Sequence, residues 1–282
     1  TSSNQTDTRG SLLQVDSTGT LDVSALRSLV DSSLVVDGHD VTLDQLTGAT
    51  GSTFSIQSGS VDLPLLESLL GGRIQLASGG SILIPRVTQI DGTSFDLTGG
   101  TTLSLPGVRH YRHAAQSDSV DRVWRVSGAG SSLTLPDLES LSGGTRFNSS
   151  HVIEALAGGS IQLPLIRQMI DPVAGNVSFR KFLILASGTD SEIDAPLLDH
   201  VIDRSADADN QRSVLNAEAG GRLNLPSLKH VHGFIIDVDT AGDLPIAGLV
   251  TLQDSHVAIN NQPADFAALE SIRQGRLVLA GT

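Results

Sequence analysis

Hydrophobic and polar residues alternate in short segments that recur along nearly the whole chain. The clearest example is RIQLASGGSILIPRVTQI, residues 73–90. Ile74 and Leu76 alternate with polar neighbours, a Gly-Gly pair follows, and a second alternating segment ends at Pro85. Alternation with a period of two is typical of a strand that is buried on one side. The segment therefore predicts two short strands joined by a glycine corner, followed by an aliphatic exit.

The same pattern can be aligned along the chain on Pro85. The equivalent positions are Ser24, Asp44, Pro64, Pro85, Pro106, Pro136, Pro164, Pro196, Pro226, Pro245 and Ala267. Self-similarity at such a period indicates a stacked repeat, in which coils bury together the aliphatic side chains that one coil cannot bury alone. We therefore predict an all-β fold, a parallel β-solenoid (β-helix) of about 11 coils. Its basic repeat is 20–21 residues, with four longer coils.

The repeat also suggests a simple domain organisation. Residues 1–10 are polar and read as a lead-in, and residues 11–282 read as a single β-solenoid. The last segment, RLVLAGT, matches the first strand of the repeat, so the chain stops halfway through a coil. Because an open end exposes apolar side chains and strand edges, this favours a fragment of a longer protein with neighbouring repeats. A frayed last coil is the alternative.

Four insertions interrupt the repeat at the same point of successive coils. They occupy residues 112–123, 142–152, 170–182 and 202–214. In a solenoid, insertions at one repeat position must project from one edge and lie next to one another. Insertions stacked on one face often form a binding surface.

Basic and aromatic residues gather in and beside these insertions, and they are the candidate ligand-binding residues. The set is Tyr111, Arg112, Trp124, Arg146, Phe147, Phe179, Arg180, Lys181 and Arg212. Arginine presents a planar fork that suits carboxylates or sulfates, and aromatic rings can stack on sugar faces. In the alternative interpretation, the arginines pair with nearby aspartates and the rings pack the insertions onto the coil.

Composition excludes several classes of function. The formal net charge of −13 argues against non-specific nucleic-acid binding, which needs a basic surface. The chain has no cysteine, so disulfide scaffolds and thiol catalysis are excluded. The sequence contains no apolar stretch long enough to predict membrane insertion.

Two groups of residues could hold a metal ion. Asp203, Asp207 and Asp209 lie in an acidic loop whose oxygens suit calcium, but the loop lacks the glycine and final glutamate of an EF-hand. A solvated acidic loop is the alternative, and calcium is the only cofactor we consider. His200 and His230 share one repeat position and are one coil apart, so they could share an ion; a structural or solvated role is favoured for both.

No motif of an enzyme family is present. A polysaccharide lyase or glycoside hydrolase would need two carboxyl groups roughly 5–9.5 Å apart, and the sequence does not identify such a pair. Catalysis is therefore not the favoured interpretation, although it stays open.

The coil length, the short strands, the glycine corners and the acidic composition resemble secreted bacterial parallel β-helix repeat proteins, as in large adhesins. Segments such as LPLLESL and LPSLKHV also look like leucine-rich repeats, but the asparagine ladder of that family is missing. The resemblance implies an extracellular or cell-surface protein. We expect a non-catalytic binding module for polysaccharide or cell-surface glycan, with the inserted edge as the contact surface. A structural spacer or adhesin stalk without a ligand is the main alternative.

Overall fold

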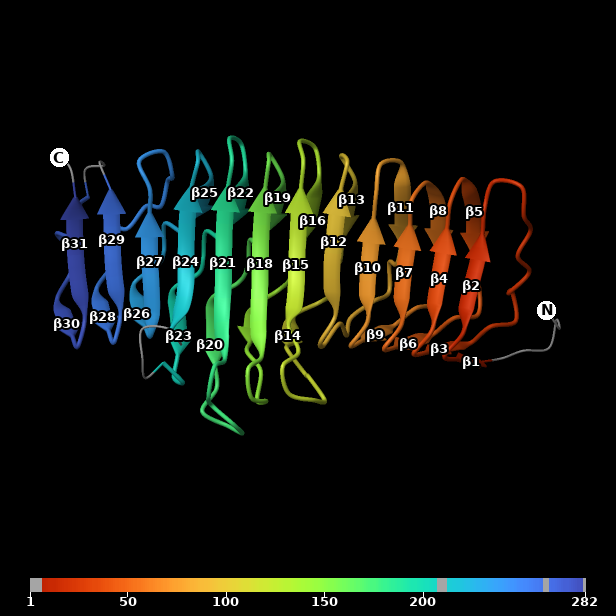
Figure 1. Ribbon diagram of the computed structural model, residues 1–282, viewed down its shortest axis with the longest axis horizontal. Coiled ribbons are helices and arrows are strands. Elements are labelled where there is room, and N and C mark those ends of the chain that lie inside the picture. The colour runs from red at the N-terminus through yellow and green to blue at the C-terminus, as the bar shows by residue number, and fades with distance from the viewer. Residues whose placement is uncertain (1–6, 207–211, 261–263, 281–282) are drawn as a thin grey trace.

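The chain folds as a parallel β-solenoid. The computed structural model describes residues 7–206, 212–260 and 264–280, and these contain strands but no helix. Every strand pair is parallel, and successive coils stack along one axis (Figure 1). The predicted all-β fold class is confirmed. Within the described residues, no helix has the length and apolarity needed to cross a membrane.

One face of the solenoid is a continuous 12-stranded sheet, which we call the long sheet. It is built from the strand that precedes the glycine corner of each coil. Its strands, in spatial order, are β2 (Leu12–Val15), β4 (Ser33–Val36), β7 (Thr53–Ile56), β10 (Arg73–Leu76), β12 (Ser94–Thr98), β15 (Arg122–Ser127), β18 (Ser150–Leu156), β21 (Lys181–Ser187), β24 (Ser213–Glu218), β27 (Phe234–Val238), β29 (His256–Asn260) and β31 (Arg276–Ala280).

The strand that leads to the anchor proline forms two further sheets. The first contains β5 (His39–Thr42), β8 (Gly59–Asp62) and β11 (Gly80–Leu83). The second contains β13 (Thr102–Ser104), β16 (Ser132–Thr134), β19 (Ser160–Gln162), β22 (Glu192–Asp194) and β25 (Arg222–Asn224).

The aliphatic exit after the proline forms a third strand, which the sequence pattern did not identify as one. Its first sheet contains β1 (Asp7–Arg9), β3 (Ser28–Val30), β6 (Gly48–Thr50) and β9 (Ser68–Leu70). Its second sheet, which we call the exit sheet, contains β14 (His110–Arg112), β17 (Ser140–Ser142), β20 (Gln168–Asp171), β23 (His200–Asp203), β26 (His230–His232), β28 (Thr251–Gln253) and β30 (Ser271–Arg273).

The strand register places equivalent repeat positions on top of one another. Ile74 of β10 pairs with Phe54 on one side and Phe95 on the other, and all three are buried. Inward side chains therefore form continuous apolar columns through the solenoid. Burial of these columns between coils is the main favourable term for a fold of this kind.

Short and long coils differ at the corner between the exit strand and the long sheet. In the short coils, one residue with positive φ turns the chain, as at Asp31, Gly51 and Gly71. A Cβ atom on Gly51 would lie 2.2 Å from Asp31 Oδ1, so the corners of stacked coils approach closely. In the long coils, loops replace this corner and project side by side from the lower edge of the solenoid (Figure 1).

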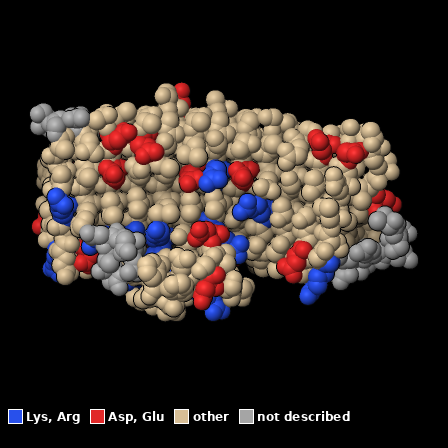
Figure 2. All heavy atoms as spheres, in the orientation of Figure 1, with Lys and Arg blue, Asp and Glu red and all other residues tan. Residues whose placement is uncertain are grey.

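The outward face of the long sheet carries few charged side chains, and near its middle a basic side chain lies between acidic ones (Figure 2). Arg125 Nε, for example, lies 2.6 Å from Glu154 Oε2 of the adjacent coil. Exposed pairs of this kind contribute about 0–1 kcal/mol each, so they add little to stability.

Candidate binding site on the long loops

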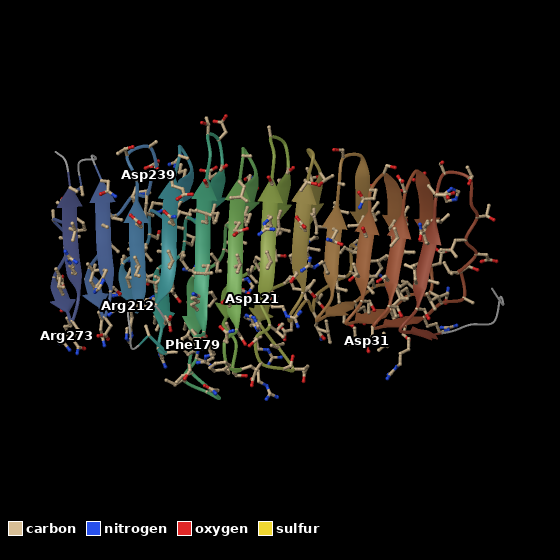
Figure 3. All side chains as sticks on the ribbon, viewed as in Figure 1. Asp31, Asp121, Phe179, Arg212, Asp239 and Arg273 are labelled. Carbon is tan, nitrogen blue, oxygen red and sulfur yellow. The ribbon has the colours of Figure 1, made fainter. Side chains whose placement is uncertain are left out.

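The long loops join the exit sheet to the long sheet in four successive coils. We call them the loop edge and define it as residues 113–121, 143–149, 172–180 and 204–206. Phe179, Asp121 and Arg212 lie in or close to this edge, whereas Asp239 lies at the opposite one (Figure 3).

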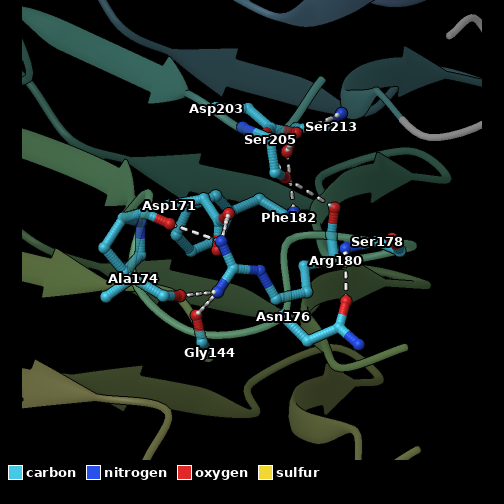
Figure 4. Close-up of polar contacts among 11 residues, drawn as sticks. Gly144, Asp171, Ala174, Asn176, Ser178, Arg180, Phe182, Asp203, Ser205 and Ser213 are labelled. Carbon is cyan, nitrogen blue, oxygen red and sulfur yellow. Dashed lines mark hydrogen bonds and ion pairs between the residues drawn. The ribbon is translucent and has the colours of Figure 1, made fainter. Parts of the chain in front are cut away.

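A buried arginine holds two neighbouring loops together (Figure 4). Arg180 is fully buried, and its Nη1 donates hydrogen bonds to the carbonyl oxygens of Gly144 at 2.8 Å and Ala174 at 2.7 Å. Its Nη2 donates to the Asp171 carboxylate at 2.9 Å and to the carbonyl oxygen of Pro172. Arg180, predicted to contact ligand, is therefore a structural residue inside the loop edge.

The predicted calcium ligand Asp203 is also buried. Its Oδ1 accepts hydrogen bonds from the backbone and hydroxyl of Ser205 at 2.9 and 2.7 Å, and its Oδ2 accepts them from Ser213 at 3.1 and 2.7 Å. The Ser205 hydroxyl also donates to the carbonyl of Arg180 at 3.4 Å, which links Asp203 to the arginine network. Asp207 and Asp209 lie outside the described residues, so the calcium site stays a prediction.

Asp171 completes this network as the partner of Arg180. Burial raises the pKa of the Asp171 carboxyl, while the Arg180 guanidinium favours the charged form and the nearby Asp203 carboxylate opposes it. Removing either partner of a buried pair leaves an uncompensated charge in the interior. The network should therefore be rigid and intolerant of substitution.

Two aromatic residues predicted to stack on a ligand lie in the core instead. Tyr111 and Trp124 are buried and contact each other edge-to-face, with 4.9 Å between ring centroids. Their polar atoms both reach the carbonyl oxygen of Thr93, at 3.3 and 3.1 Å. Tyr111 pairs with Leu141 and Trp124 with Ile153, so both occupy inward columns of the repeat. The alternative interpretation, packing of the rings onto the coil, holds for these two residues.

Two buried histidines extend this aromatic cluster, and the sequence analysis gave them no role. The His151 ring lies 4.8 Å from Tyr111 and 4.9 Å from Trp124, and neither ring nitrogen has a hydrogen-bond partner among the described residues. His113 Nε2 lies 3.1 Å from the carbonyl oxygen of Ser150. Burial lowers the pKa of His113 to about 4 and that of His151 well below its ordinary value. The register could have revealed His151, because it pairs with buried Phe182.

Phe147 and Phe179 come from successive loops, and the structure brings them together. Their rings lie edge-to-face with centroids 5.6 Å apart, and Phe179 is 42% exposed. Arg146, beside Phe147 in the chain, is exposed as well. The loop of Phe179 also exposes Val173 and Val177. We call Arg146, Phe147, Val173, Val177 and Phe179 the loop patch.

Phe179 has an unusual backbone conformation, with φ at +60°. A bulky side chain rarely adopts this left-handed region, and the strain is about 1–2 kcal/mol. Strain of this kind often marks functional sites. The conformation places an aromatic ring on the loop edge, close to the start of β21 (Figure 3).

The other predicted basic residues, Arg112, Lys181 and Arg212, are not part of the loop patch. Arg112 is 74% exposed on its side chain and pairs with Asp91 at 2.8 Å, beside an open groove of about 740 Å³. Arg109, also in the groove, pairs with Glu139. Arg212 donates from Nε to the carbonyl of Asp254 at 2.8 Å, and Lys181 is half-buried at the start of β21. The groove arginines are thus already paired with carboxylates.

No protein-family model matches this chain, and neither a curated protein nor a solved structure matches it. The functional argument therefore depends on the geometry of the loop edge.

Proposed function

We propose that the chain is a non-catalytic binding module that recognises polysaccharide or cell-surface glycan through the loop patch. One observation carries the proposal: successive loops of a rigid solenoid present the neighbouring rings of Phe147 and Phe179, and the exposed Arg146 directly precedes Phe147 in the chain. Binding residues on loops that a regular scaffold positions are a common arrangement.

Glycan chemistry fits the loop patch in two ways. The apolar faces of sugar rings pack against aromatic rings, and both phenylalanines are held by neighbouring loops that the buried Arg180 ties together. The Arg146 guanidinium can form bidentate hydrogen bonds with the carboxylate of a uronic acid or with a sulfate. The proposed ligand is therefore an acidic polysaccharide.

The two buried acids next to the loop edge, at the ends of β20 and β23, support binding more than proton transfer. Asp171 bonds to Arg180, and Asp203 accepts hydrogen bonds from two serines, so both carboxylates are engaged inside the protein. An extracellular or cell-surface location follows as part of the proposal, because glycans of this kind are presented there.

A glycan array with neutral and acidic polysaccharides, read at low and at physiological salt, tests the proposal. We expect the native chain to bind uronate-containing or sulfated chains, more weakly at the higher salt concentration because exposed charges are screened. The double variant Phe147→Ala/Phe179→Asn should lose binding. Asparagine is chosen at position 179 because it tolerates positive φ.

Two single variants separate the contributions. Arg146→Gln should lose the salt-sensitive part of the binding and keep the rest. Arg273→Gln is the matched control, because Arg273 is exposed at the far end of the solenoid from Phe179 (Figure 3). If the native chain binds no glycan on the array, or if the double variant binds as the native chain does, the result would contradict the proposal and favour a structural spacer.

A further inference from the structure

The exit sheet carries a column of polar side chains at one register position, which in β14 to β26 lies four residues after the anchor proline. In register, these residues are His110, Ser140, Gln168, His200, His230, Thr251 and Ser271. This column lies on another face than the loop patch and plays no part in the proposed function. Two histidines meet at one point only, where β23 lies beside β26.

At this point three metal-binding side chains converge. His200 and His230 are direct register partners, and their rings stack with centroids 4.5 Å apart. Asp199 precedes His200, and its Oδ2 lies 3.0 Å from His200 Nδ1. One donor atom from each of the three residues lies within 4.8 Å of the others.

We infer that Asp199, His200 and His230 form a binding site for a divalent transition-metal ion such as Zn²⁺. Two imidazoles and one carboxylate suit ions of this class, whereas calcium and magnesium prefer oxygen ligands alone. Three protein ligands also leave a coordination position open to solvent. All three side chains are half-buried, so an ion there is partly shielded from water.

The distances are compatible with coordination after a small adjustment. Zn–N and Zn–O bonds of about 2.0–2.2 Å place tetrahedral ligands roughly 3.4 Å apart. The donors must therefore approach one another by about 1.4 Å at most, the difference between 4.8 Å and 3.4 Å, which side-chain rotation on a sheet surface can supply. The backbone of β23 and β26 is fixed by the strand pairing and need not move.

Neighbouring residues orient and tune the three ligands. His230 Nδ1 lies 2.9 Å from Thr251 Oγ1 in the next coil, a contact that restrains the imidazole ring, as hydrogen bonds to metal ligands commonly do. Lys229 Nζ lies 3.8 Å from Asp199 Oδ1. Because its charge repels a cation, Lys229 should weaken metal binding, and its removal should strengthen it.

Titration calorimetry of the full chain with Zn²⁺ tests the site. We expect one ion per chain. Each of the variants Asp199→Asn, His200→Gln and His230→Gln should weaken Zn²⁺ binding by more than the roughly 10–100-fold lost when a hydrogen bond to a metal ligand is removed. Lys229→Gln should tighten binding. Far-UV circular dichroism should be unchanged in all four, because these side chains project from the sheet surface.

A neighbouring histidine provides the matched control. His232 Nε2 pairs with Asp254 at 3.2 Å on the same sheet, so it offers one imidazole and one carboxylate but no second histidine. His232→Gln should bind Zn²⁺ like the native chain. Absence of stoichiometric binding by the native chain, or full affinity in any of the three ligand variants, would overturn the assignment. Either result leaves the glycan proposal unaffected, because glycan binding is assigned to the loop patch and not to the exit sheet.

Discussion

The short coils before Gly92 and the long coils that follow have the same strand order but close one corner differently. A short coil turns with a single left-handed residue, such as Asp31 or Gly71. A long coil replaces that residue with a loop of the loop edge. The short corner needs only a left-handed residue and a nearby serine hydroxyl, as at Asp31 and Ser32, whereas the long loops need ionisable side chains to hold them.

The buried polar groups of the two regions reflect this difference. In the short coils they are hydroxyls that bond to nearby carbonyls, as Ser32 does to Val30 at 2.8 Å. The long coils also bury serines, but they add ionisable side chains: His113, His151, Asp171, Arg180 and Asp203 are all buried. A loop outside the sheet ladder must satisfy its backbone carbonyls by other means, and Arg180 does so for three of them. A projecting binding edge thus requires a polar interior of its own.

Replacing Arg180 should have the largest effect and should act on the long coils alone. Arg180→Met leaves the Asp171 carboxyl and three carbonyls without their partner, and breaking a buried pair costs about 3–5 kcal/mol. Trp124 is the single tryptophan and lies in the long coils, so its fluorescence during urea denaturation reports this region. We expect the Trp124 fluorescence of Arg180→Met to show its unfolding transition at a lower urea concentration than that of the native chain.

The double variant Arg180→Met/Asp171→Leu is the matched control. It removes both charges and keeps apolar volume, so it should recover part of the lost stability. If the single variant unfolds at the same urea concentration as the native chain, the polar network does not hold the loops.

A substitution at a corner of the short coils should have the next largest effect. Gly59 has a φ of +86°, and a Cβ atom there would lie 2.0 Å from the carbonyl oxygen of His39 in the preceding coil. We expect Gly59→Ala to lower the free energy of unfolding by about 2–3 kcal/mol, from backbone strain and the clash between coils. Far-UV circular dichroism during urea denaturation should show this change, with a smaller effect on Trp124 fluorescence.

Gly71→Asn is the control for that substitution. Gly71 is also left-handed, but the nearest atom to an added Cβ is Arg122 Nη2 at 3.8 Å, and Asp31 occupies the equivalent corner of another coil. Asparagine should therefore be tolerated. Equal losses of unfolding free energy in Gly59→Ala and Gly71→Asn would show that backbone conformation, and not the contact between coils, determines which residues these two positions tolerate.

The difference between the two regions also explains what the sequence could predict. Alternation and a fixed period follow from strand geometry, so the solenoid and its buried apolar columns could be predicted from the sequence. The third strand was missed because its exit segment has too few inward positions to show alternation. Tyr111 and Trp124 were misassigned by residue type, although their repeat positions already matched those of Leu141 and Ile153.

The loop edge itself was less predictable. That Phe147 and Phe179 would be neighbours follows from stacked insertions of similar length. The burial of Arg180 depends on where three loop carbonyls point, and no periodic pattern encodes this.

Acid should weaken the long coils before the short ones. Burial lowers the pKa of His113 to about 4, with Arg122 acting in the same direction, and burial, His113 and Arg122 lower that of His151. At these two histidines the unfolded chain therefore binds protons that the folded chain does not, whereas the raised pKa of buried Asp171 acts in the opposite direction for one proton. Stability should fall as the pH drops from about 6.5 towards 4, by up to about 1.4 kcal/mol per pH unit for each histidine. The Trp124 transition measured at several pH values checks this.

His151→Phe sharpens that test. A phenyl ring fits the aromatic surroundings of Tyr111, Trp124 and Phe182, and His151 gives up no hydrogen bond to a described residue. We expect the variant to be as stable as the native chain at pH 8 and more stable at pH 5. If the variant shows the same pH dependence of stability as the native chain, groups other than His151 cause the loss of stability in acid.

The smallest effect should come from Phe179, where a long loop adopts the left-handed conformation that the short coils give mainly to glycine. Phe179→Gly removes a strain of about 1–2 kcal/mol but adds about 0.5–1 kcal/mol of unfolded-state entropy, so its net effect on stability should be slight. Phe179→Ala keeps the strain and loses the ring contacts, so it should be less stable than the glycine variant, the reverse of the usual order. If both variants also lose glycan binding, the strain is maintained for the ring and not for the fold. If alanine is the more stable of the two, the conformation is not strained, and the backbone argument for the loop patch fails.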